Sequence, residues 1–184
     1  PDVVSSRKTC EKMEWDFNLI KVPLGNLIND FKELAVRWEC KKKTQFECTW
    51  PFLYVYPCIT EEFVLTGLGA DGYHGLSKKA MIHFKQTKEK FDEFRTEHYG
   101  QKNLGGQLQQ LMLCKEYDIT QIAPSLDPSV FNYFLKYDWD QLNKPRQKTK
   151  IIEAFRDEFL VTGVRKHRNL QLISGIDKIF HQLL

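Results

Sequence analysis

The chain has 184 residues, of which 42% are hydrophobic and 28% are charged, a balance typical of a globular protein large enough to bury a core. A formal net charge of +3 is too small to indicate a nucleic-acid-binding protein, and no apolar run approaches the roughly 18 residues that a membrane span requires. We therefore expect a cytoplasmic protein that binds neither nucleic acid nor a membrane. The chain opens on Pro1 without an initiator methionine or a signal peptide, and we expect it to be a fragment.

Cysteine usage agrees with a reducing compartment. The count is odd, and the spacing includes neither a C-x-x-C pair nor a zinc pattern. We expect buried, reduced thiols at Cys10, Cys40, Cys48, Cys58 and Cys114.

Residues 1–76 alternate in type along the chain. The pattern predicts a helix over Val3–Glu14, a strand over Asp16–Val22 and a helix over Leu24–Glu39. Trp50–Pro57 is aromatic, and its prolines fit either a capped helix or an edge segment. A further strand is expected over Phe63–Thr66. Strands that alternate with helices predict an α/β fold with a parallel, doubly wound sheet.

Residues 77–184 are predicted to be almost wholly helical, either as a layer on the sheet or, as we favour, as a lobe that closes over the strand ends. Asp127 and Pro128 have the composition of a helix start. The expected helices are Ser77–Glu97, Gly105–Tyr117, Asp127–Tyr137, Thr149–Leu160 and Ile176–Leu184.

The loop after the strand at Phe63–Thr66 is the strongest functional signal. It contains glycines at 67, 69, 72 and 75 with Asp71 among them. Glycine allows positive φ and a close backbone approach, and successive N–H groups can bind an anion. A carboxylate beside bound phosphates commonly holds Mg²⁺. The alternative is a tight strand-to-helix turn without a ligand.

Four segments together carry a family resemblance. The string T-G-L-G-A-D-G-Y-H-G resembles the S-G-E-G-A-D-E-L-F-G-G loop of asparagine synthetases, which belong to the adenine-nucleotide α-hydrolase, or pyrophosphatase-loop, group. Ile122–Val130 is similar to the P-F-L-D segment of that family, Lys148–Phe155 to its K-x-x-L-R-x-A-F helix start, and Arg165–Gly175 to its R-x-K-x-x-F-Q segment. Pro1–Pro23 resembles the stretch in which the family places a helix and its third strand.

The resemblance implies an ATP-dependent ligase that forms AMP and pyrophosphate. A carboxylate would attack the α-phosphate of ATP, and an amine or ammonia, from a separate glutaminase or other source, would then displace AMP. Asp71 would hold Mg²⁺, and Lys148 would contact the phosphates, with Lys150 as the alternative. The backbone around the loop would cradle the pyrophosphate, and its residues are Gly67, Gly69, Ala70 and Gly72.

The chain also departs from the family pattern. The phosphate loop S-G-G-x-D-S is absent. Leu68 stands where the family has a catalytic Glu, which argues against aspartate as the substrate, and Gly72 replaces a second Glu. We therefore keep two hypotheses: a ligase acting on an unknown small carboxylate, and a non-catalytic descendant that serves as a binding or assembly module.

Other candidates are weaker. His74 and His83 could form a metal pair, although structural histidines are commoner. The aromatic run at Trp50–Tyr56 could stack on a ligand but fits packing better, and Arg165–Arg168 fits a solvated basic turn. Glu47 and Cys48 precede the aromatic run and are candidates to approach the site, where no base is identifiable for a cysteine nucleophile.

Overall fold

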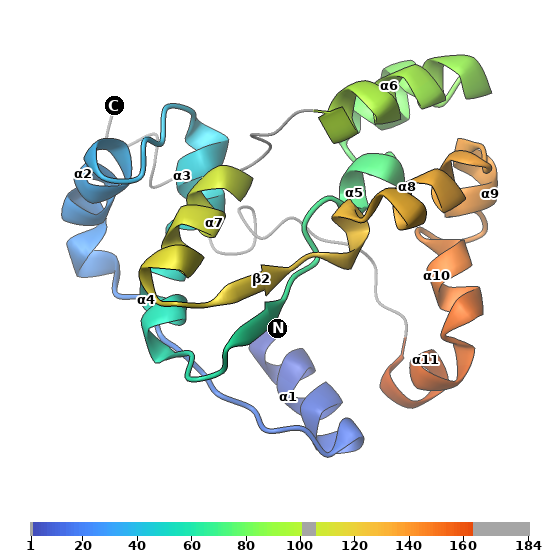
Figure 1. The fold of residues 1–184 in the computed structure, drawn as a ribbon. Helices are drawn as coiled ribbons and strands as arrows, with labels where there is room; N and C mark the ends of the chain where they lie inside the picture. Colours follow the sequence, from blue (N-terminus) through green and yellow to red (C-terminus); the bar gives the residue numbers. More distant parts are fainter. Residues whose placement is uncertain (1, 101–105, 164–184) are drawn as a thin grey trace.

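The computed structural model describes residues 2–100 and 106–163, and this part of the chain is mostly helical (Figure 1). The helix expected at Gly105–Tyr117 is present as Gln107–Glu116. The single helices expected at Ser77–Glu97 and Thr149–Leu160 are each divided in two: a π-helical turn at Ala80–Phe84 precedes a helix at Lys88–Gly100, and helices at Thr149–Ala154 and Arg156–Thr162 meet at Phe155. The helix expected at Ile176–Leu184 and the segments Arg165–Arg168 and Arg165–Gly175 lie outside the described residues. The α-helices of the described part are α1 (Asp2–Met13), α2 (Leu27–Val36), α3 (Lys43–Thr49), α4 (Phe52–Val55), α5 (Ala70–Tyr73), α6 (Lys88–Gly100), α7 (Gln107–Glu116), α8 (Pro128–Leu135), α9 (Trp139–Asn143), α10 (Thr149–Ala154) and α11 (Arg156–Thr162).

Shorter helical turns connect several of these helices. Three are 3₁₀ turns, and the fourth, η3, is a π-helical turn. They are η1 (Leu24–Asn26), η2 (Tyr56–Cys58), η3 (Ala80–Phe84) and η4 (Pro124–Leu126). None of the described helices is both long enough and apolar enough to cross a membrane.

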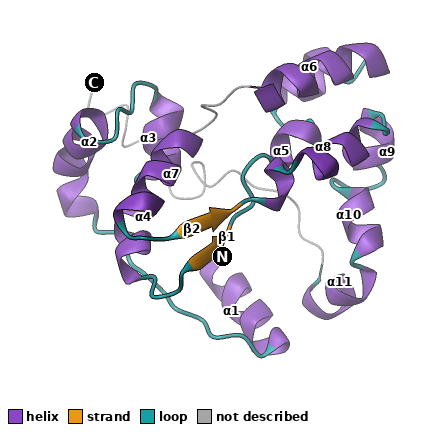
Figure 2. Cartoon of the chain, viewed as in Figure 1, coloured by secondary structure: helices purple, strands orange, loops and turns teal. Residues whose placement is uncertain are grey.

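A two-stranded parallel sheet lies between two groups of helices (Figure 2). Strand β1 (Phe63–Leu65) pairs in register with β2 (Thr120–Ile122). The ladder continues at both ends, because the Thr120 N–H donates to the Glu62 carbonyl at 2.8 Å and the Thr66 N–H to the Ile122 carbonyl at 2.9 Å. The chain crosses from one group of helices to the other along both strands.

The expected doubly wound sheet is wrong. In the described residues the sheet has only β1 and β2, and Asp16–Val22 is not a strand. This segment has no partner strand there; its Val22 packs on a hydrophobic cluster instead. The partner of β1 is β2, a three-residue strand too short to show an alternating pattern.

The first lobe, built from α2, α3, α4 and α7, has its own core. Leu27, Phe31, Leu34 and Trp38 are buried at helical spacing along and just beyond α2. Asp30 lies on the same helix and is also buried; its Oδ2 accepts hydrogen bonds from Trp50 Nε1 and from the Tyr54 hydroxyl, each at 2.7 Å. The aromatic run therefore fastens α3 and α4 to α2.

The second lobe, built from α5, α6, α8, α9 and α10, surrounds a separate core of mainly aromatic side chains. Its buried members include Phe91 and Phe94 from α6 and Phe131 and Phe134 from α8. Helix α11 continues from α10 and contacts α1, where Lys12 Nζ donates to the Val161 carbonyl at 2.7 Å. Tyr73 and Ala80 both belong to this second core, so it spans the boundary expected between residues 76 and 77.

One face of the sheet is apolar and exposed in the described structure. Phe63, Leu65 and Ile122 are 53%, 74% and 40% exposed, whereas Val64, which points to the other face, packs on the first core. Parallel sheets are usually covered on both faces, so this exposure is a distinctive property of the sheet.

Arg95 connects α6 to the end of α8. Its side chain is fully buried, its guanidinium donates to the carbonyls of Phe134 at 2.8 Å and Tyr137 at 3.0 Å, and it pairs with Asp92. These contacts add side-chain donors to the carbonyl groups at the end of α8, where the Tyr137 N–H also donates to the Phe134 carbonyl at 3.2 Å.

We expect Arg95→Met to lower the free energy of unfolding by about 1–3 kcal/mol, because it removes the hydrogen bonds of a fully buried guanidinium to the carbonyls of Phe134 and Tyr137. Lys88→Met is the matched control: Lys88 pairs with the same Asp92 and donates to the Leu135 carbonyl, but it is exposed. It should cost less than about 1 kcal/mol. Urea denaturation of the two variants measures the difference, and equal costs would contradict this role of Arg95.

Candidate functional site

The candidate site begins where β1 ends. The chain passes through Thr66–Gly69 and enters the single turn of α5, and Gly69 has a φ of +85°. A Cβ at Gly69 would lie 2.5 Å from Leu126 Cδ2. Because Leu126 belongs to the loop after β2, the loops at the carboxyl ends of the two strands pack directly on one another. The Tyr73 hydroxyl adds a hydrogen bond to Ser125 Oγ at 3.1 Å.

Gly67 has a different environment from Gly69. A Cβ built at Gly67 meets no atom of the described residues within 4 Å. Gly69 is thus required by the packing of the two loops, whereas Gly67 keeps the backbone open on its solvent side. A ligand could approach this loop closely only where the backbone is open in this way.

Asp71 and Lys148 meet beside this loop. Lys148 Nζ lies 2.8 Å from Asp71 Oδ1, and the two side chains are 31% and 51% exposed. Lys148 directly precedes α10 with a φ of +60°, and its N–H donates to Asn143 Oδ1 at 3.3 Å. Asn143 Nδ2 in turn donates to the His74 carbonyl at 2.7 Å. One buried amide therefore fixes the start of α10 against the end of α5.

Lys150 lies elsewhere. Its Nζ pairs with Glu153 Oε2 at 2.7 Å and sits 5.5 Å from the centre of the Tyr137 ring. Of the two lysines that the sequence nominated, Lys148 is the one in contact with Asp71. Ala70 and Gly72 belong to α5 with Asp71, and Gly72 is buried.

A cavity of about 440 Å³ adjoins the loop. Its lining brings together both lobes, because the loop and α5 face residues from α3, α4 and α7. The Thr66 hydroxyl oxygen is buried here without a hydrogen-bond partner among the described residues. The lining consists of Cys48, Phe52, Thr66, Gly67, Leu68, Gly69, Asp71, Gly72, Gln107 and Gln110.

The first lobe supplies residues that sequence reasoning reached only in part. Cys48, expected to approach the site, lines the cavity, whereas the adjacent Glu47 is buried and lies 3.6 Å from Lys43 Nζ. Gln107 and Gln110 were missed, because only the tertiary packing of α7 brings them to the loop. Phe52 lines the cavity, but Trp50 and Tyr56 are buried in the first core, so the aromatic run packs and forms no stacking platform.

The residues present fit Mg²⁺ bound together with phosphates better than a metal held by protein alone. Within the described residues there is no group of three or more His, Cys, Asp or Glu side chains that could hold a metal ion. Mg²⁺ usually takes one or two carboxylates and completes its shell with phosphate oxygens and water. Asp71 could supply that carboxylate, and the buried Thr66 oxygen lies in the lining of the same cavity.

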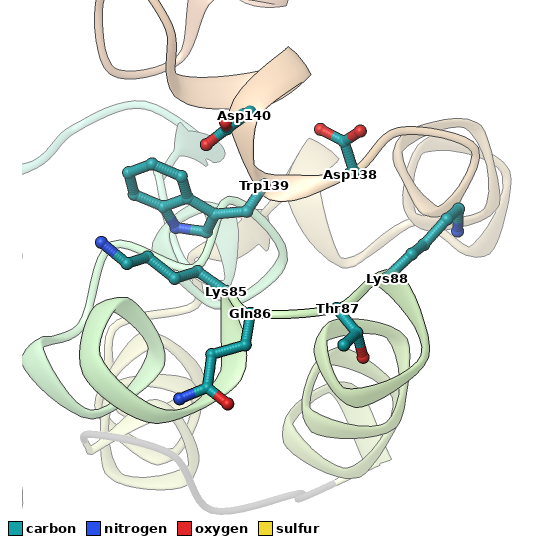
Figure 3. A pocket seen from close by; sticks show the side chains of 7 residues that line it. All are labelled: Lys85, Gln86, Thr87, Lys88, Asp138, Trp139 and Asp140. Atoms are coloured by element: carbon teal, nitrogen blue, oxygen red, sulfur yellow. The ribbon is translucent and has the colours of Figure 1, made fainter.

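A second, smaller hollow of about 200 Å³ lies between α6 and α9 (Figure 3). Several of its polar side chains have structural partners. Trp139 Nε1 donates to the Gly75 carbonyl at 3.0 Å, Lys85 Nζ lies 5.3 Å from the Trp139 ring, and Asp138 accepts from the Gln141 N–H at 2.7 Å. This hollow is therefore a weaker candidate than the loop cavity.

His74, next to the site, is fully buried and does not pair with His83, which lies exposed on η3. Its ring packs against Tyr73 and Phe134, at 4.6 Å and 4.9 Å between ring centres, and those two rings stack on each other at 4.8 Å. Its Nδ1 is 2.9 Å from the Ala70 carbonyl; a carbonyl only accepts, so Nδ1 carries the proton. Burial lowers the pKa of His74 from 6.5 to about 4, which keeps the ring neutral.

This lowered pKa makes stability depend on pH. Between pH 6.5 and 4 the His74 imidazole becomes protonated in the unfolded chain but stays neutral in the folded protein. The free energy of unfolding should therefore fall as the pH falls through this window, by up to about 3 kcal/mol. Chemical denaturation at several pH values measures the slope. His74→Asn keeps a donor for the Ala70 carbonyl and should flatten it, whereas H83N should not; an unchanged slope in H74N would contradict the assignment.

The two glycines should respond differently to alanine. Gly69→Ala should cost at least about 1 kcal/mol, from the positive φ and the contact with Leu126. Gly67→Ala should change stability by less than about 0.5 kcal/mol, as surface substitutions usually do. Thermal or urea unfolding of the pair tests this, and equal losses would show that the loops do not depend on Gly69.

Comparison of the chain with protein-family models, with curated proteins and with solved structures found no match in any of the three. The functional argument therefore rests on the residues of the site themselves.

Proposed function

We propose that the protein binds the phosphate chain of ATP with Mg²⁺ at the Gly67–Gly72 loop, and that it acts as a ligase that forms AMP and pyrophosphate. The observation that carries the proposal is the contact between Asp71 and Lys148 at 2.8 Å, beside an open glycine backbone and a cavity. The expected doubly wound sheet is not part of the argument, which uses only the site.

The pair combines the two charges that a magnesium–phosphate group needs. Lysine is a compact cation on a flexible stem and binds phosphate oxygens well. The Asp71 carboxylate would take Mg²⁺, which when bound neutralises phosphate charge and orients the chain. Both side chains are partly exposed, so each can turn from its partner to a ligand.

The cavity supports a second substrate. It shares Asp71 and the glycine loop with the ion pair, so a small acid bound there would present its carboxylate close to the phosphates. The protein's task would be to align the carboxylate with the α-phosphate and to stabilise the developing charge. An amine or ammonia from a separate source would complete the amide.

A non-catalytic binding module is the second candidate, and Leu68 favours it. Leu68 lines the cavity at the centre of the loop, and Asp71 is the one carboxylate among the described lining residues. A site that keeps the phosphate contacts without a second acidic group would bind a ligand without turning it over.

Calorimetric titration with magnesium pyrophosphate tests the binding step. Asp71→Asn and Lys148→Ala should each weaken binding at least about tenfold, the effect of losing one charge-assisted contact, while leaving stability nearly unchanged. Lys150→Ala should have little effect. Asp140→Asn and Lys144→Ala, which break an exposed pair at 2.6 Å on and just beyond α9, are the matched controls.

Measurement of ATP turnover distinguishes the ligase from the non-catalytic binding module. For a ligase supplied with its acid, Lys148→Ala should lower kcat more than it raises the KM for ATP, because the contact strengthens in the transition state. Tight pyrophosphate binding without pyrophosphate release from ATP would favour the binding module. No pyrophosphate binding, or equal binding by the wild type and the Asp71 and Lys148 variants, would refute both assignments of the site.

A further inference from the structure

We infer that the cavity beside the glycine loop takes an uncharged, largely apolar group, so that the acid used by this protein is a monocarboxylic acid with a neutral chain. The inference rests on the proposed function for the role of the acid, but it concerns the cavity alone. It is argued from the charge, polarity and size of the lining.

The charge of the lining excludes a second carboxylate on the substrate. Among the described residues that line the cavity there is no Lys, Arg or His, and the one charged side chain of this described lining is the Asp71 carboxylate. A dicarboxylate would bury its distal charge among neutral side chains without a counter-charge, which is unfavourable. An acid with a neutral chain avoids this cost.

The walls are suited to an aliphatic or aromatic chain with one neutral polar group. Phe52 and Leu68 supply apolar surface, and the Phe52 ring is held by Tyr56 at 4.9 Å between ring centres. Gln110 is only 3% exposed, and its Nε2 donates to the Cys48 carbonyl at 3.0 Å, which fixes the amide in place. The Thr66 hydroxyl, buried without a partner in the described structure, could serve one hydroxyl or amide on the ligand.

The orientation follows from the shared residue. Asp71 belongs both to the lining and to the pair with Lys148, so the reactive end of the acid lies toward Lys148 and its chain lies toward the first lobe. The volume of about 440 Å³ is within the range of small-molecule sites, about 300–1,000 Å³. Leu68 lies on the glycine loop and lines the cavity. It is then the residue that sets the preference for an acid with a neutral chain.

The rate at which Cys48 is alkylated reports whether the cavity is occupied, and this measurement does not depend on enzymatic activity. The experiment follows iodoacetamide labelling of Cys48 by peptide mass spectrometry, with hexanoate or adipate present. Burying the five alkyl carbons of hexanoate (four methylene groups and a methyl group) predicts a Kd of about 1 mM, so that about 10 mM should slow labelling about tenfold. Adipate, with the same six carbons and a second carboxylate, should slow labelling less than about twofold. Exposed Cys58, which is not in the lining, is the internal control.

Two loop variants sharpen the test. Leu68→Arg places a cation in the lining and should reverse the preference toward adipate, whereas Leu68→Met should keep the preference for hexanoate. Equal protection by both acids, protection by neither, or a Cys48 that never labels would overturn the inference. Magnesium pyrophosphate binding, measured separately on the same samples, distinguishes this failure from failure of the proposed function.

Discussion

The parallel pairing of β1 and β2 is the constraint on which the rest of the structure depends. It sets Phe63 opposite Thr120 and Leu65 opposite Ile122, so both strands end at the same edge of the sheet. The loops that follow then meet, and a glycine becomes necessary at position 69 because Leu126 fills the space beside it. A ladder of three residue pairs thereby determines where α5 begins and where the Asp71 side chain is presented.

The ion pair at the site depends on a second, longer chain of contacts. Lys148 comes 77 positions after Asp71 in the sequence, yet Asn143 holds its backbone to the end of α5 through the His74 carbonyl. The neutral ring of His74 packs beside these contacts, against the rings of Tyr73 and Phe134. Burial of neutral groups thus supports a partly exposed pair of charges.

Short patterns in the sequence predicted local features of the structure better than they predicted which strands pair. The glycine loop, the strand before it and the lysine before α10 all follow from short motifs, and the structure places Lys148 against Asp71. The doubly wound sheet failed because alternation alone does not say whether a strand finds a partner. Asp16–Val22 has the composition of a strand but no ladder in the described residues, while Thr120–Ile122 has a ladder and too few residues to be recognised. Gln107 and Gln110 carry no local signal, since their place at the cavity is decided by how α7 packs on α3 and α4.

The shortness and exposure of the ladder also affect its motion. Phe63 and Leu65 lie largely in solvent, and few backbone hydrogen bonds join the strands, so local opening here should need much less free energy than opening of either core. A ligand held by the loop would have to order this segment, and part of its binding free energy would be spent on that ordering. Occupancy of the loop would then be detectable in the strands as slower amide hydrogen exchange, several residues from any atom that the ligand touches.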